Sequence, residues 1–236
     1  MNKINFYKLK YSIDLKIVGN IYNTELNYQI EEFIDNKNND KERFDLYRGG
    51  DSDHINSNID MTVFKAHNNA IMTDLMSSSF FRQNGYFISN RFAELLKEFN
   101  IEESKLLDCT ITNKQKKYSY KFLSIIATSK NINIENSTFR VIEDTAYNPV
   151  IKENNIKFNS LGDLADKTRE TYFETNGEFK LEPIRVILNR STDLFQSELD
   201  YTTLISERLK NKIEYEGLTG FDFERAKLKT EFYEDF

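Results

Sequence analysis

The segment Thr73-Asp74-Leu75-Met76-Ser77-Ser78 occurs a second time in the chain, with two substitutions, as Thr192-Asp193-Leu194-Phe195-Gln196-Ser197. The Thr, the Asp, the Leu and the final Ser are identical, and the two copies start 119 residues apart. A repeat of this kind indicates that one small structural unit is used twice. It is therefore the best starting point for predicting the fold.

A second pair of similar segments follows the first pair in the same order. Ile88-Ser89-Asn90-Arg91-Phe92 matches Ile205-Ser206-Glu207-Arg208-Leu209. Ser89 and Ser206 have the character of helix N-caps, because a serine hydroxyl can accept a hydrogen bond from a free N–H of the first turn. Two matched pairs in one order predict an internal duplication, with units around residues 73–102 and 192–221.

Each predicted cap is followed by a short amphipathic helix. Phe92, Leu95, Leu96 and Phe99 share one helical face, and Leu209 and Ile213 form a narrower one. Asn100 and Gly217 follow these helices at equivalent positions, and both residue types tolerate the left-handed conformation that ends a helix. Ile101 and Leu218 come next and are expected to pack back on the helices.

The remaining pattern predicts an α+β fold with mixed or antiparallel sheets, a few short helices and two related structural units in one body. Residues Glu31–Asp60 are polar and predicted to be mostly loop. Strands are expected at Phe6–Lys16, Leu106–Thr112, Tyr118–Ala127, Phe139–Glu143, Ile156–Phe158, Phe179–Leu188 and Phe221–Phe223, with a hairpin turn at 113–116. A capping box at Ser160 predicts a helix that continues through Leu161, Leu164, Ala165, Thr168 and Tyr172. No Pro-rich or Gly/Ser-rich linker occurs, so we expect one domain, 1–236.

Composition narrows the functional classes. With 14% aromatic residues the chain is expected to fold as a globule, and its net charge of −6 without a dense basic segment disfavours nucleic-acid binding. Cys109 is the only cysteine, which suits a reducing compartment. The N-terminus lacks a signal-peptide pattern and no apolar run is long enough for a membrane span. We therefore expect a cytoplasmic protein.

The search for catalytic chemistry finds weak candidates. His54 and His67 are the only histidines, and neither stands in a pattern typical of a general base. Asp51-Ser52-Asp53-His54 lacks the spacing of a calcium loop and is interpreted as a solvated turn. Cys109 is expected to be a small buried side chain in a strand. The sequence thus predicts no catalytic, cofactor-binding or metal-binding residues and no enzyme activity.

One enzyme alternative remains open. Tyr47-Arg48-Gly49 resembles the start of the arginine-specific ADP-ribosyltransferases, and Ser77-Ser78-Ser79 with Glu214-Tyr215-Glu216 would supply that family's later motifs. The glutamates of that family lie on a loop leading into a strand, whereas Glu214 and Glu216 end a predicted helix. This context argues against the alternative.

The charged residues of the repeat are interpreted as structural. Asp74 and Asp193 begin turns, where a carboxylate usually accepts hydrogen bonds from nearby backbone N–H groups. Arg91 and Arg208 lie in the first helical turn, where a cation opposes the helix dipole. Each arginine is therefore expected to pair with an acid, and the repeated Asp is one candidate. Ser89, Ser206 and Gly217 complete this structural set.

The stretch 204–223, Leu-Ile-Ser-Glu-Arg-Leu-Lys-Asn-Lys-Ile-Glu-Tyr-Glu-Gly-Leu-Thr-Gly-Phe-Asp-Phe, resembles the C-terminal pattern of a bacterial family of immunity proteins from polymorphic toxin systems. The resemblance extends over residues 70–224 and includes the helix at Ile88–Phe99 and the strand pair Leu106–Thr112 and Tyr118–Ile126. The Asn-rich N-terminal segment does not match. Leu123-Ser124 also replaces the usual aliphatic-Asn step.

The resemblance implies a binding protein that neutralises a cognate toxin without catalysis of its own. The acidic balance would suit a basic toxin such as a nuclease. Partner contacts are expected in unrepeated acidic segments, at Glu31, Glu32, Asp35, Asp51 and Asp53. No nucleic acid and no membrane is expected as partner. A non-catalytic scaffold that self-associates through the repeated units is a further alternative.

Overall fold

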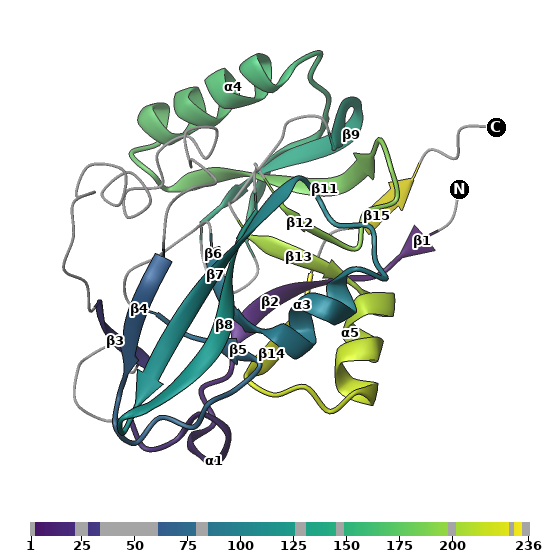
Figure 1. Cartoon of the computed structure of the whole chain (residues 1–236). Helices are drawn as coiled ribbons and strands as arrows, with labels where there is room; N and C mark the ends of the chain where they lie inside the picture. Colours follow the sequence, from purple (N-terminus) through teal and green to yellow (C-terminus); the bar gives the residue numbers. More distant parts are fainter. Residues whose placement is uncertain are drawn as a thin grey trace. The chain divides into compact units, whose positions relative to one another are not determined.

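The computed structural model describes residues 3–21, 28–33, 61–78, 85–125, 131–144, 149–197, 202–226 and 229–232. These residues form an α+β fold with three sheets and four helices (Figure 1). Contacts divide the chain into two compact units. Unit 1 comprises Met1–Phe6, Ser129–Ser191 and Arg225–Phe236, and unit 2 comprises Tyr7–Thr128 and Thr192–Glu224. The expectation of one domain stays a prediction.

Unit 1 is built on a five-stranded mixed sheet. Its strand order is β1 (Lys3–Ile4), β15 (Lys229–Phe232), β11 (Phe179–Leu188), β9 (Ile132–Glu143) and β10 (Ile151–Ile156). The pair β11 and β15 is parallel, and the other three pairs are antiparallel. Helix α4 (Leu161–Glu174) connects β10 to β11 and contacts β11.

The start of α4 follows the predicted capping pattern. Ser160 Oγ accepts a hydrogen bond from the Asp163 N–H at 3.1 Å, as expected of an N-cap. Leu164 and Thr171 are the buried residues of the helix, whereas Tyr172 is 60% exposed. Tyr172, predicted as a residue through which the helix continues, thus lies on its exposed side. Thr168 donates its hydroxyl to the Leu164 carbonyl at 2.7 Å.

Unit 2 contains two sheets and the other three helices. The four-stranded sheet has the order β12 (Leu194–Gln196), β13 (Thr203–Ser206), β2 (Phe6–Tyr11) and β14 (Phe221–Arg225). The six-stranded sheet has the order β3 (Ile30–Phe33), β4 (Met61–Ala66), β7 (Ser104–Asn113), β8 (Lys116–Ile125), β6 (Gly85–Ser89) and β5 (Leu75–Met76). The helices are α1 (Leu15–Val18), α3 (Asn90–Leu96) and α5 (Glu207–Tyr215).

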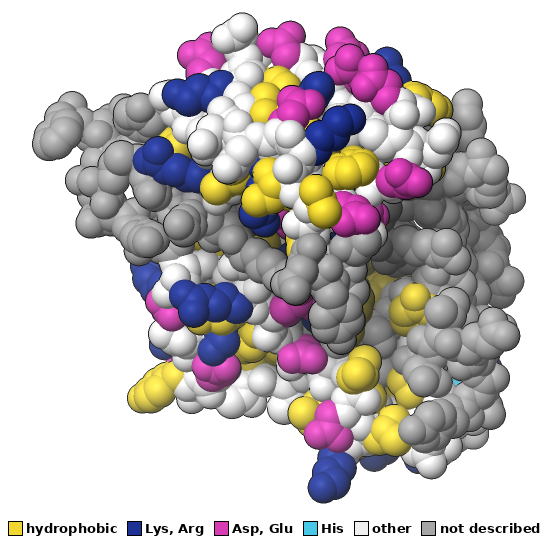
Figure 2. Space-filling model, turned by 180° about the vertical axis from the view of Figure 1, so that it is seen from behind, with side chains coloured by type: hydrophobic (Ala, Val, Ile, Leu, Met, Phe, Trp, Pro, Cys, Tyr) yellow, Lys and Arg dark blue, Asp and Glu magenta, His cyan; other side chains and the backbone are white. Residues whose placement is uncertain are grey.

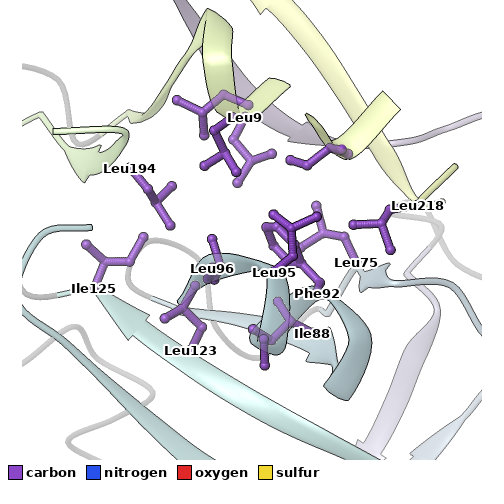
Figure 3. Close-up of a cluster of buried hydrophobic side chains, with 14 residues drawn as sticks. Leu9, Leu75, Ile88, Phe92, Leu95, Leu96, Leu123, Ile125, Leu194 and Leu218 are labelled. Atoms are coloured by element: carbon purple, nitrogen blue, oxygen red, sulfur yellow. The ribbon is translucent and has the colours of Figure 1, made fainter. Parts of the chain in front are cut away.

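The two repeated segments share one hydrophobic core in unit 2 (Figure 3). Leu75 pairs with Ile88 across β5 and β6, and Leu194 pairs with Ile205 across β12 and β13. All four side chains belong to the same buried cluster, together with residues of α3 and α5. The repeat thus supplies side chains to a common interior in both of its copies.

The sheets around the two copies nevertheless differ. The first copy forms the edge of a six-stranded sheet through β5, and the second forms the edge of a four-stranded sheet through β12. The relation between two whole structural units therefore stays a prediction. The strand predicted at Phe6–Lys16 is shorter than expected, because Leu15–Val18 is helical. The strand predicted at Ile156–Phe158 lies earlier, as β10, and β14 is followed by a further strand, β15.

The predicted hairpin is confirmed, with a tighter turn than expected. Strands β7 and β8 pair in register from Ser104 to Asn113. The two residues between them, Lys114 and Gln115, have φ values of 46° and 68°. Two consecutive residues with positive φ are typical of a type I′ turn, in which Asn-Gly is the preferred pair.

This turn yields a stability prediction. Replacing Lys114 by Asn and Gln115 by Gly is expected to raise the free energy of unfolding by about 1 kcal/mol, because both new residues tolerate left-handed backbone. Urea denaturation followed by circular dichroism measures the change. As a control, the same Asn-Gly pair at Lys116-Lys117, inside the strand β8, should destabilise the protein.

Candidate functional site

The first copy of the repeat is organised around Asp74. The Asp74 carbonyl oxygen accepts the backbone N–H of Ser89 at 2.9 Å, and Asp74 Oδ1 accepts the Ser89 hydroxyl at 2.6 Å. Ser89 Oγ in turn accepts the N–H of Phe92 at 3.1 Å, which confirms the predicted N-cap of α3. The aspartate therefore orients the serine that begins the helix.

The second copy repeats these contacts around Asp193. Its carbonyl oxygen accepts the Ser206 N–H at 2.8 Å, and its Oδ1 accepts the Ser206 hydroxyl at 2.6 Å. Ser206 Oγ accepts the Leu209 N–H at 3.2 Å, so the predicted N-cap of α5 is also confirmed. The local hydrogen bonding of the two segments is thus the same.

The second carboxylate oxygen of each aspartate binds the opposite copy. Asp74 Oδ2 accepts the backbone N–H of Thr219, which follows α5, at 2.9 Å. Asp193 Oδ2 accepts the backbone N–H of Asn100, which follows α3, at 3.0 Å. Each aspartate therefore joins the cap of its own helix to the chain leaving the other helix. The sequence pattern identifies both aspartates, but it does not predict that each one bonds to the opposite copy.

The two repeated arginines have different partners. Arg208 donates to Asp193 from Nε at 3.2 Å and from Nη2 at 2.5 Å, and its guanidinium lies 4.6 Å from the centre of the Phe99 ring. Arg91 instead donates to the backbone carbonyl of Glu216 and lies 3.9 Å from its carboxylate. Pairing with the repeated aspartate is confirmed for Arg208 and wrong for Arg91. Arg91 is placed at the end of α5, where helix carbonyls lack intrahelical partners.

Asp193 is buried, with 6% of its side chain exposed. Burial alone would raise the pKa of this carboxyl group, but hydrogen bonds from Arg208, Ser206 and the Asn100 N–H outweigh that effect and lower the pKa from its ordinary value of 3.8. Asp193 is therefore charged at neutral pH. Its chemistry is that of a satisfied structural anion, since its oxygens are occupied by donors from within unit 2.

The two helix ends also differ from each other. Gly217 has a φ of 63°, as predicted for a left-handed stop. Asn100 does not have positive φ, so the same prediction is wrong there. The backbone of Asn100 instead bonds to Asp193: its N–H donates to Asp193 Oδ2, and its carbonyl accepts the Asp193 N–H at 2.5 Å.

The residues considered for catalysis have structural surroundings where they are described. Cys109 is buried in β7, and burial raises the pKa of its thiol to about 12, which keeps it protonated and unreactive at neutral pH. His67 is buried, and its Nδ1 accepts the Asn69 N–H at 3.1 Å in a turn. His54 lies outside the described residues. Within the described residues, no group of three His, Cys, Asp or Glu side chains is arranged to hold a metal ion.

Only some residues of the ADP-ribosyltransferase-like motifs lie in the part of the chain that the structure describes. Glu214 pairs with Lys210 at 2.7 Å, and Glu216 pairs with Lys212 at 3.0 Å, so both glutamates belong to ion pairs of α5 and its C-cap. Ser78 is buried. Tyr47-Arg48-Gly49 lies outside the described residues, and the alternative stays untested.

The acids predicted to contact a partner are mostly outside the described residues. Glu31 and Glu32 are in β3, which pairs with β4. Asp35, Asp51 and Asp53 are not described. Their role in binding stays a prediction.

A surface feature of unit 1 was not anticipated. Tyr172 and Phe173 are 60% and 70% exposed at the end of α4, and Val150 and Ile151 are 59% and 49% exposed at the start of β10. We call these four residues the apolar end of unit 1. Tyr172 and Phe173 are adjacent aromatic residues in a largely polar helix, and the sequence pattern predicted the helix but not their exposure.

Comparison with protein-family models and comparison with curated proteins both gave no match for this chain. None of the helices among the described residues is long and apolar enough to cross a membrane. The resemblance of residues 204–223 to immunity proteins therefore stays a prediction.

Proposed function

We propose that the protein is an immunity protein, which binds a cognate bacterial toxin and inhibits it stoichiometrically. The proposal rests on the resemblance of residues 204–223 to the C-terminal pattern of such proteins. It predicts that inhibition requires a protein–protein contact and no catalytic step by this chain.

The positions of that stretch have roles in folding, which is what a pattern shared among binding proteins with different partners would require. Ser206 caps α5, Leu209 and Leu218 enter the core, and Arg208 pairs with Asp193. Gly220 allows the chain to pass close to Leu75, since a Cβ there would lie 2.1 Å from the Leu75 carbonyl oxygen. Partner recognition would then belong to surfaces outside the stretch.

The charge of the chain supports a basic partner. The formal net charge is −6, and Figure 2 shows acidic, basic and hydrophobic side chains interspersed on the coloured part of one face. An acidic inhibitor is attracted to a basic toxin at long range, which raises the association rate.

We further propose that the two repeated segments arose by internal duplication. The support is the matched hydrogen bonding of Asp74 with Ser89 and of Asp193 with Ser206. The matching strand pairs Leu75–Ile88 and Leu194–Ile205 agree with it.

The binding proposal is tested with the product of the gene directly upstream. The two proteins are purified separately and mixed, and isothermal titration calorimetry measures affinity and stoichiometry. We expect a 1:1 complex with a Kd of about 10 nM or lower, in the range of tight inhibitor complexes. Heat signals no larger than dilution at 50 µM, about five thousand times that Kd, would reject the proposal.

A further inference from the structure

The apolar end of unit 1 places two large aromatic side chains in solvent. Tyr172 and Phe173 contact each other edge to face, with ring centres 5.7 Å apart. Covering an aromatic side chain is worth about 1.5–3 kcal/mol, so leaving two exposed is unfavourable unless something else covers them. Exposed aromatics that become buried are the residues that dominate binding energy in protein interfaces.

The Tyr172 side of the aromatic pair is packed against the end of the helix. Asn176 and Gly177 both have positive φ, 51° and 81°, and the Gly177 N–H donates to the Tyr172 carbonyl at 2.8 Å. The Tyr172 ring lies against this turn, so that a Cβ at Gly177 would be 3.1 Å from ring atom Cε2. A side chain fixed before binding loses less conformational entropy when a partner covers it.

The exposed residues of β10 belong to the same end of unit 1. The Glu143 N–H donates to the Val150 carbonyl at 2.9 Å, and the Asp144 N–H donates to the Glu178 carbonyl at 2.7 Å. The end of β9 is therefore bonded on one side to the start of β10 and on the other to the turn after α4. Val150 and Ile151 therefore lie at the end of the sheet that the turn after α4 also joins.

The charges on α4 and the turn that follows it are mainly acidic. Residues 163–178 contain five acidic and two basic residues, a net charge of −3. The two cations have acidic neighbours, since Lys167 contacts Glu153 and Glu170 and Arg169 contacts Asp166. Glu174 and Glu178, which flank the aromatic pair, are both exposed. An acidic rim around an apolar centre complements a basic protein surface and repels a second copy of itself.

We infer that the apolar end of unit 1 is the docking surface for the toxin, which would present an apolar pocket edged by Lys and Arg. This inference rests on the proposed function and moves the expected contact from the acids between Glu31 and Asp53 to α4 and β10. Phe173 is its most exposed anchor and Tyr172 its most fixed one.

The test uses the full chain and the product of the upstream gene, with Kd measured by calorimetry. Phe173→Ala is expected to raise Kd about 30-fold, and Tyr172→Ala with Phe173→Ala several hundredfold. The matched control is Tyr215→Ala, because Tyr215 is 84% exposed on α5 and should leave Kd unchanged. Thermal unfolding of each variant checks that the fold is retained. Phe173→Ala should disturb the fold least, because the Phe173 side chain is mostly exposed.

Charge-reversal variants separate the electrostatic attraction of the toxin from the packing of its surface on the aromatic side chains. Glu174→Lys with Glu178→Lys is expected to slow association about tenfold at low salt, whereas Glu94→Lys on α3 should not. If the wild-type chain binds and Phe173→Ala binds equally well, the docking surface is wrong while the proposed function stands. If the wild-type chain does not bind, both are rejected. Sedimentation of the chain alone provides a further check. If the wild type is a dimer and Phe173→Ala is a monomer, the surface binds a second copy of the chain, and the inference is overturned.

Discussion

Replacing Asp193 by alanine is expected to lower the free energy of unfolding by about 3 kcal/mol. The substitution removes a buried carboxylate that accepts from Ser206, from the Asn100 N–H and from Arg208. Removing the acceptor from a buried hydrogen-bonded network costs more than one typical bond, because the remaining donors lose their partner. Urea denaturation measures the change.

Asp74→Ala is the matched comparison. Asp74 holds Ser89 and Thr219 in the same way but is only partly buried, and no arginine among the described residues bonds to it. We expect its replacement to cost about 1–2 kcal/mol. Equal losses at both positions would show that the Arg208 pair adds nothing to stability.

The Asp193 carboxylate also makes the stability of the fold depend on pH, in a direction that its pKa shift determines. Because the pKa of Asp193 is lower in the folded than in the unfolded chain, its charge stabilises the fold fully above the unfolded value near 4. This contribution is lost as the pH falls from there through the folded pKa. The stability difference between wild type and Asp193→Asn should therefore shrink between pH 5 and about pH 2. A difference that stays constant over this range would contradict the assignment.

Replacing Gly220 by alanine is expected to cost about 3 kcal/mol or more. Its φ is 92°, and the new Cβ would lie 2.1 Å from the Leu75 carbonyl oxygen and 2.8 Å from the Thr73 side chain. Both neighbours belong to the first repeated segment, so relief requires the two segments to separate. Denaturation of the purified variant, or its failure to accumulate, measures the effect.

Gly217→Ala is the control for this prediction. Gly217 also has positive φ, 63°, but nothing lies within 4 Å of a Cβ placed there. Only the left-handed backbone is penalised, so about 1 kcal/mol is expected. If both alanine variants lost the same stability, the close approach at Gly220 would not matter.

Local features of the fold could be predicted because they depend on neighbouring residues. The caps at Ser89, Ser206 and Ser160 each need one hydroxyl three residues before an N–H, and all three are present. Strand β11 was also predicted with its observed ends, Phe179 and Leu188. These features follow from spacing alone.

Features that depend on contacts between distant segments could not be predicted. Arg91 lies at the end of α5 and not beside Asp74, which only the packing of the two helices determines. Tyr172 was predicted only as a residue through which the helix continues, and the packing of α4 leaves Tyr172 exposed while Thr171 is buried. The spacing therefore predicted the helix but not which of its side chains stay exposed.

The central claim is that this chain neutralises a toxin by binding it, and growth of bacteria that produce both proteins tests it most directly. The product of the upstream gene is expressed alone, with the wild-type chain, and with Phe173→Ala. We predict that growth stops with the toxin alone. With the wild-type chain, growth should be full although the amount of toxin is unchanged, and Phe173→Ala should protect the cells less well. Growth that stays arrested while both proteins are present would contradict the account.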